Sequence, residues 1–140
     1  MFTRMLVCYD GSASSKKALH AAVMLAQERG AELCCLTVEE GLPTYAGSID
    51  EFQDVKEERD TYYTEVQAAA KRIAAEHGLA LATRIEAGHP AQTIVRVAKE
   101  GGYDLVVMGH RGHSSVWGTF MGTTAEKVTR HVTCSVLVVR

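Results

Sequence analysis

The sequence has 140 residues, the length of one domain, and its shares of hydrophobic residues (46%) and charged residues (23%) are those of a soluble globular protein rather than a disordered chain. A formal net charge of −2 without a run of Lys or Arg argues against nucleic-acid binding. No apolar stretch reaches the roughly 18 residues of a membrane span, and the one at the start is too short for a signal peptide, so we expect a cytoplasmic protein that does not enter a membrane.

The first third of the chain predicts a strand, a helix and a second strand. The apolar run 4–9 is the first expected strand, and residues 12–15 offer caps for a helix that ends before Gly30. The second expected strand is 32–38. Apolar residues that recur at helical spacing form the expected buried face of the helix: Ala18, Leu19, Ala22, Val23 and Ala26.

The middle of the chain predicts a loop, a long helix and a third strand. Two glycines and a proline mark a loop over 41–47, and Asp50 can cap a helix that runs to about His77. The run 79–86 is the third expected strand. The expected inward stripe of the long helix is Phe52, Val55, Tyr62, Val66, Ala69 and Ile73.

The rest of the chain repeats this alternation. Gly88-His89-Pro90 is a turn whose proline opens a helix, and the continuous apolar run 104–108 is typical of a strand covered on both faces. A glycine-rich stretch, 109–122, precedes an expected helix at 123–131 and an expected strand at 136–139. The expected buried face of the helix that Pro90 opens is Ala91, Ile94, Val95 and Ala98.

Five strands separated by helices predict a single α/β domain over residues 1–140, with a parallel sheet covered by helices on both faces and right-handed crossovers. Ligands bind to such sheets beyond the carboxyl ends of the strands, where the strand order reverses. The strand order itself does not follow from the pattern, but a flavodoxin-like order 3-2-1-4-5 places the first and fourth strands side by side. The residues after these two strands, Asp10-Gly11-Ser12 and Gly109-His110-Arg111-Gly112, are the most polar and glycine-rich strand ends of the chain.

The segment 109–124 contains the parts of a phosphate site. Gly109 and Gly112 lack a Cβ and allow the backbone to approach a ligand. Gly122-Thr123-Thr124 opens the last helix, whose first N–H groups and dipole favour phosphate. A Walker A motif is excluded because Thr123 stands where that motif has Lys, and no G-x-G-x-x-G follows the first strand.

Cysteine and histidine spacing does not indicate a metal or redox site. No pair among Cys8, Cys34, Cys35 and Cys134 has C-x-x-C spacing, and all four fall in apolar runs, so we expect reduced, buried thiols. His110 and His113 have no Cys or carboxylate near them in sequence, and we expect no metal site there.

The spacing Gly109-x2-Gly112-x9-Gly122-Thr123 resembles the G-x2-G-x9-G-[S/T] signature of ATP-binding universal stress proteins. The first strand and turn (6–12), the turn 88–91 and the segments 125–128, 130–131 and 136–139 are similar to this family as well, so the resemblance covers nearly the whole chain. Thr133 and Ser135 depart from it, since the family often has Pro at these two positions. It implies a fold like that of adenine-nucleotide α-hydrolases and the binding of ATP, with Mg²⁺ as the usual companion of a triphosphate.

The resemblance also implies roles for individual residues. Asp10 contacts the ribose or adenine side, Val38 packs on the adenine or hydrogen-bonds it through its backbone, and Cys8 and Met108 line the base pocket. Backbone between Gly109 and Gly112 wraps the ribose and phosphates. The candidate nucleotide-binding residues are Cys8, Asp10, Val38, Met108, Gly109, His110, Arg111, Gly112, Gly122, Thr123 and Thr124.

Simpler roles stay open for several of these residues. Asp10, Thr123 and Thr124 are also good helix caps, the glycines also suit plain turns, and Arg111 is equally compatible with a position in solvent. His110 occupies a variable position of the family and inherits no role of its own.

The leading interpretation is a nucleotide-dependent regulatory module that acts on an unknown protein partner. The alternatives are a slow ATPase or self-phosphorylating enzyme, and an interaction module that binds no nucleotide. Fast hydrolysis is not expected without a Walker-type lysine or an evident general base. If the last strand lies at the sheet edge, Val136, Leu137, Val138 and Val139 expose an apolar edge, and pairing with a second copy would cover it, as in dimers of the family.

Overall fold

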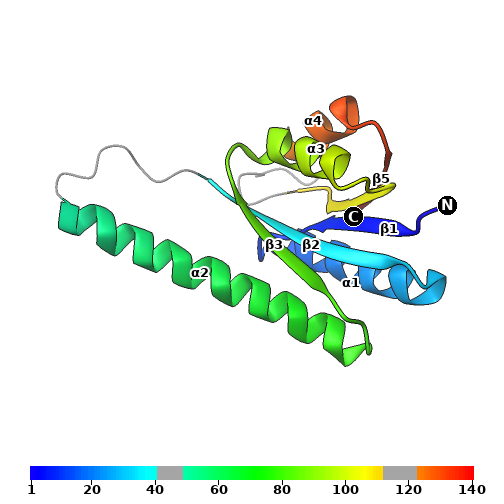
Figure 1. The fold of residues 1–140 in the computed structure, drawn as a ribbon, viewed down its shortest axis with the longest axis horizontal. Coiled ribbons are helices and arrows are strands. Elements are labelled where there is room, and N and C mark those ends of the chain that lie inside the picture. Colours follow the sequence, from blue (N-terminus) through cyan, green and yellow to red (C-terminus); the bar gives the residue numbers. More distant parts are fainter. Residues whose placement is uncertain (41–48, 112–122) are drawn as a thin grey trace.

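The computed structural model describes residues 1–40, 49–111 and 123–140, with the backbone alone for 49–52. Strands and helices alternate along the chain (Figure 1). The elements are β1 (Arg4–Cys8), α1 (Ala13–Arg29), β2 (Glu32–Glu39), α2 (Ile49–Glu76), β3 (Ala82–Ala87), α3 (Pro90–Glu100), β4 (Leu105–Gly109), α4 (Thr123–His131) and β5 (Ser135–Val139).

The strands form one parallel sheet with the order β3-β2-β1-β4-β5. β1 lies in the middle, where Leu6 pairs with Cys34 of β2 on one side and with Val106 of β4 on the other. The predicted α/β fold and the order 3-2-1-4-5 are therefore confirmed. The strand order reverses between β1 and β4, so the carboxyl ends of these strands are the expected ligand position.

Helices cover both faces of the sheet (Figure 1). Because successive strand residues point to opposite faces, Met5 and Val7 of β1 pack with α1 and α2, whereas Leu6 packs with α3 and α4. Cys34 and Cys35 divide between the two layers in the same way. All four cysteines are free thiols that are buried or half-buried, as expected for small apolar side chains.

The boundaries and buried face of α1 agree with the sequence pattern. Ser12 is the N-cap, and its hydroxyl accepts a hydrogen bond from the Ser15 N–H at 3.2 Å. Gly30 ends the helix in the left-handed conformation, with φ of 64°. All five apolar residues predicted for the inner face are buried: Ala18, Leu19, Ala22, Val23 and Ala26.

The predicted inward stripe of α2 is only partly correct. Val66 is buried, but Tyr62 is 44% exposed, and the other fully buried positions are Ala70 and Ala74 rather than Ala69 and Ile73. Figure 1 shows the cause, since the first half of α2 extends beyond the end of the sheet and has no strand beneath it. The helix also begins at Ile49, which places Asp50 inside its first turn instead of before it.

Two smaller predictions need correction. β3 begins at Ala82 rather than Leu79, because the Leu79 N–H donates to the Ala74 carbonyl and belongs to the end of α2. In α3, Val97 is fully buried and Val95 is half-buried, so the inner face lies closer to Val97 than predicted. Pro90 opens α3 as expected.

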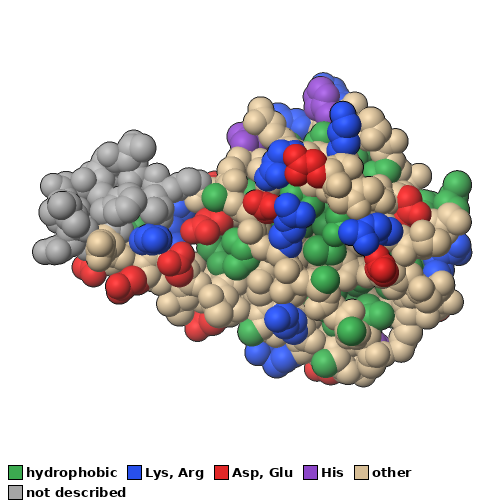
Figure 2. Space-filling model, viewed as in Figure 1, with side chains coloured by type: hydrophobic (Ala, Val, Ile, Leu, Met, Phe, Trp, Pro, Cys, Tyr) green, Lys and Arg blue, Asp and Glu red, His purple; other side chains and the backbone are tan. Residues whose placement is uncertain are grey.

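The two edge strands of the sheet differ in character. On β3, Arg84 pairs with Glu86 at 2.5 Å, and Glu86 also pairs with Arg96 of α3 at 3.6 Å. Figure 2 shows charged side chains of both signs interspersed on this face of the molecule. β5 has the sequence Ser-Val-Leu-Val-Val and carries no charge, and Leu137 is 39% exposed. Charges protect a strand edge from pairing, so only β5 is left as an unprotected apolar edge among the described strands.

Candidate functional site

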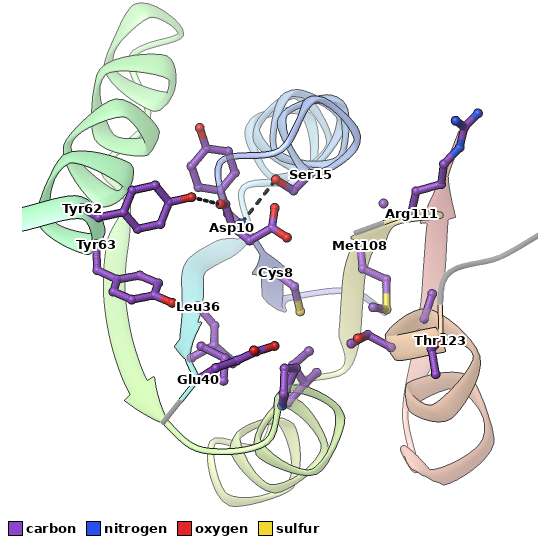
Figure 3. A pocket seen from close by; sticks show the side chains of 17 residues that line it. Cys8, Asp10, Ser15, Leu36, Glu40, Tyr62, Tyr63, Met108, Arg111 and Thr123 are labelled. Atoms are coloured by element: carbon purple, nitrogen blue, oxygen red, sulfur yellow. Dashed lines mark hydrogen bonds between the residues drawn. The ribbon is translucent and has the colours of Figure 1, made fainter. Parts of the chain in front are cut away.

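A cavity of about 430 Å³ opens at the carboxyl ends of β1, β2 and β4 (Figure 3). Its position is the one expected from the reversal of strand order between β1 and β4. The lining residues are Cys8, Tyr9, Asp10, Ser15, Leu36, Val38, Glu40, Tyr62, Tyr63, Pro90, Ile94, Met108, Gly109, Arg111, Thr123, Thr124 and Ala125.

Most of the candidate residues meet at this cavity. Those that line it are Cys8, Asp10, Val38, Met108, Gly109, Arg111, Thr123 and Thr124. His110 is not among the lining residues; its Nε2 accepts a hydrogen bond from Arg111 Nε at 2.9 Å. Gly112 and Gly122 lie outside the described residues.

The turn between β1 and α1 holds Asp10 in place. One carboxylate oxygen of Asp10 accepts from the Ser12 N–H at 2.9 Å, and the Asp10 N–H donates to the Ser15 hydroxyl at 3.3 Å. Ser12, not Asp10, is the N-cap of α1. Asp10 therefore forms an Asx turn before the helix while its side chain lines the cavity, so its structural contact and a ligand contact are compatible.

Gly109 brings the end of β4 against α1. A Cβ at this position would lie 2.8 Å from the backbone carbonyl carbon and oxygen of Ser14, which is closer than real Cβ contacts. The Arg111 N–H also donates to the Ser14 hydroxyl, at 3.2 Å. The packing of β4 against α1 therefore requires that residue 109 has no side chain.

The opposite side of the cavity is formed by the start of α4. Thr123 and Thr124 place two hydroxyls beside the first N–H groups of this helix, where the positive end of the helix dipole lies. Figure 3 shows the Arg111 side chain extending away from the centre of the cavity, so Arg111 is a residue of the rim. This side combines hydrogen-bond donors with positive potential and suits an anion.

The floor of the cavity is apolar and comes from the ends of the central strands and from α3. Leu36 and Met108 are buried, and Cys8, Val38 and Ile94 lie beside them. Burial, together with the neighbouring Cys35 and Asp10, raises the pKa of the Cys8 thiol well above its ordinary value. Cys8 is therefore a neutral, poorly reactive part of an apolar surface.

One wall of the cavity was not predicted from the sequence: it is made by Glu40 beyond β2 and by Tyr62 and Tyr63 of α2. The Tyr62 hydroxyl donates to the Asp10 carbonyl at 3.1 Å (Figure 3). Burial and the nearby Asp10 raise the pKa of Tyr62, which keeps its hydroxyl protonated as a donor. The adjacent tyrosines on a charged helix were the available signal, but the assignment of Tyr62 to the buried stripe concealed it.

The described residues contain no cluster of three or more His, Cys, Asp or Glu side chains that would hold a metal ion. Among the helices of the described part of the chain, none has the length and hydropathy needed to cross a membrane.

These features define a class of protein. The chain is an open, doubly wound α/β protein whose cavity lies at the switch in strand order, with an apolar floor, a carboxylate beside β1 and an anion-compatible helix start.

The comparisons with known proteins identify the family within this class: residues 1–140 match the model of the universal stress protein family, and the chain belongs to that family. It is 38% identical to universal stress protein YxiE of Bacillus subtilis, over 100% of both chains.

Solved structures agree with this assignment. Universal stress protein UspA of Lactobacillus plantarum superposes with a TM-score of 0.85 at 29% identity, covering 99% of this chain and 98% of the other. A universal stress protein crystallised in complex with cAMP has a TM-score of 0.77 at 26% identity, covering 99% and 97% of the two chains.

Proposed function

We propose that this universal stress protein binds ATP in the cavity and acts as a nucleotide-dependent regulatory module on a protein partner. The observation that carries the proposal is the juxtaposition of an apolar floor with the hydroxyl-bearing start of α4 at one switch point. An adenine ring needs the first feature and a phosphate chain needs the second. The related protein that forms a complex with cAMP supports the choice of an adenine nucleotide.

In this proposal the base lies on the floor formed by Cys8, Val38 and Met108. Asp10 faces the ribose from the end of β1, and the segment 109–112, which includes His110, follows the ribose and phosphates. The phosphates are received by the backbone at Gly122 and by Thr123 and Thr124 at the start of α4. Mg²⁺ would enter with the triphosphate, bound mainly by its oxygens.

We also propose that residues 1–140 act as one cytoplasmic domain that forms a homodimer through β5. The support is the contrast between the charged edge at β3 and the uncharged edge at β5. A two-fold axis perpendicular to the sheet strands reverses their direction, so the two β5 strands related by it would pair antiparallel.

A binding experiment tests the nucleotide proposal. Thermal shift and calorimetry with ATP, AMP and cAMP, each with and without Mg²⁺, should show binding, because a ligand of the native state raises its stability. Mass spectrometry of small molecules released from the purified protein should detect an adenine nucleotide. No shift at millimolar concentrations of any of the three nucleotides would remove the proposal.

A pair of threonine variants locates the site. Thr124→Val removes a hydroxyl that lines the cavity, whereas Thr129→Val makes the same change on an exposed position of α4 outside it. We expect ATP affinity to fall about tenfold in the first variant and to stay unchanged in the second. Release of labelled phosphate from ATP, followed in the same samples, distinguishes a binding module from a slow ATPase.

A further inference from the structure

Carboxylates line the cavity at two different strand ends. Asp10 follows β1, while Glu40 follows β2, the next strand of the sheet. Neighbouring strands are about 4.8 Å apart, so Glu40 lies about 10 Å, or two strand spacings, from the end of β4. The two carboxylates therefore face different parts of any ligand that extends across the strand ends.

The anion-compatible side of the cavity fixes the direction of such a ligand. Thr123 and Thr124 stand at the start of α4, on the side of β4, while Figure 3 shows the Glu40 carboxylate directed toward the cavity from the side of β2. Negative phosphates are attracted to the helix start and repelled by Glu40. A bound nucleotide consequently places its phosphates beside α4 and its base toward Glu40.

The geometry of β2 carries Glu40 to the edge of the base. Leu36, Val38 and Glu40 are alternate residues that all line the cavity, so the apolar surface of Leu36 and Val38 ends in a carboxylate. A planar base that covers the two aliphatic side chains would present its polar edge to the third residue. Asp10, one strand closer to β4, is left for the ribose.

Hydrogen bonds to the backbone carbonyls of Glu39 and Glu40 hold the end of β2 at this position. The Arg59 guanidinium donates to the Glu40 carbonyl at 2.8 Å, and the Gly88 N–H donates to the Glu39 carbonyl at 2.9 Å. None of the ion pairs between described residues involves the Glu40 carboxylate. An ionised carboxylate accepts hydrogen bonds and donates none, so the exposed Glu40 carboxylate can exchange water for a donor that a ligand brings to it.

We infer that Glu40 is the specificity-determining residue for the base, and that it accepts a hydrogen bond from an exocyclic amino group of a purine. This inference rests on the proposed nucleotide binding. It adds the group of the base that the site recognises, the exocyclic amino group. A purine without that amino group leaves the carboxylate without its donor. Tyr63 lies on the same side of the cavity as Glu40 (Figure 3).

The test compares ATP with purine riboside 5′-triphosphate, which differs only by lacking the 6-amino group. Calorimetry on the intact chain should give the wild type an affinity about tenfold higher for ATP, as for a hydrogen bond to a charged group. In Glu40→Ala the ratio of the two affinities should fall to about twofold or less. The ratio cancels any general gain in affinity from removing a negative charge near the phosphates.

Glu39→Gln is the matched control, because it removes the neighbouring carboxylate, which does not line the cavity. It should keep the tenfold ratio, and thermal unfolding should show that both variants are folded. The inference is wrong if the ratio of the two affinities in Glu40→Ala stays at the wild-type value. If the affinities for both triphosphates then fall equally, Glu40 acts on the sugar or the phosphates and not on the base. Wild-type protein that binds neither triphosphate contradicts the proposed function itself, which separates that failure from a failure of the role of Glu40.

Discussion

Close packing at a single glycine joins the end of β4 to the first turn of α1. The position that a Cβ would occupy at Gly109 is 2.8 Å from the Ser14 carbonyl group, which belongs to rigid helix backbone. Gly109, the first glycine of the family signature, is therefore needed for the packing of the fold and not only for contact with a ligand. Motif spacing could find Gly109, but it could not reveal the neighbour that makes glycine necessary, because Ser14 lies 95 positions earlier in the chain.

We predict that Gly109→Ala lowers the free energy of unfolding by about 1–3 kcal/mol, because the added methyl group must push α1 away from β4. Urea unfolding followed by circular dichroism measures the change. Gly78→Ala is the control: Gly78 has φ of 70° and open space around it, so this variant reports the cost of backbone conformation alone. Wild-type stability in Gly109→Ala would show that the contact relaxes without cost.

The carboxylate of Asp104 acts at the same scale, at the other end of the sheet. It accepts hydrogen bonds from the N–H groups of Thr3 at 2.9 Å and Arg4 at 3.2 Å, which ties the start of β1 to the start of β4. The backbone hydrogen bond from Thr3 is the main reason why the pKa of Asp104 is lowered. A carboxyl group with a lowered pKa in the folded state stabilises the protein above its unfolded-state pKa.

We therefore predict that this stabilisation is lost as the pH falls through the folded-state pKa of Asp104. Asp104→Asn should be less stable than the wild type at pH 7, and the difference should shrink toward pH 3 as the wild-type carboxylate takes up its proton. Urea midpoints measured across this range test the prediction. A difference between the two proteins that stays constant with pH would mean that the charge of Asp104 does not contribute.

At the scale of the elements, helix α2 has two functions along its length. Its second half packs on the sheet through Val66, Ala70 and Ala74, while its first half extends beyond the sheet and supplies Tyr62 and Tyr63 to the cavity. Helical periodicity predicted the helix but assigned Tyr62 to the core. Periodicity records which residues share a face, and it contains no information on where the sheet beneath the helix ends.

The contact between α2 and the turn after β1 leads to a prediction. Tyr62→Phe removes the hydrogen bond to the Asp10 carbonyl and should lower the free energy of unfolding by about 1 kcal/mol. It should also weaken ATP binding, because Asp10 loses one of its supports. Tyr63→Phe is the matched control for stability, since no hydrogen bond between described residues uses the Tyr63 hydroxyl. Equal melting temperatures for the two variants would contradict the proposed contact.

At the scale of the whole molecule, the sheet has two exposed edges with different chemistry. The alternation of strands and helices predicted five parallel strands, and their order agrees with the expected 3-2-1-4-5. The residue pattern alone does not show that β5 lies at an edge of the sheet. That position follows only from the strand order 3-2-1-4-5. β4 connects the cavity with the β5 edge, because it pairs with β5 and also contributes Met108 and Gly109 to the cavity. A partner strand on β5 would thus be separated from β4, which lines the site, by β5 alone.

Leu137 and Ile85 allow a matched test of dimer formation. They are large apolar residues of similar exposure, 39% and 41%, on the two opposite edge strands of the sheet. We predict that the wild type is a dimer at micromolar concentration, that Leu137→Lys is a monomer because a charge is buried at the pairing edge, and that Ile85→Lys remains a dimer. Light scattering and sedimentation give the mass of each protein. A monomeric wild type would contradict pairing through β5, and a dimer that survives Leu137→Lys but not Ile85→Lys would assign the interface to β3 instead.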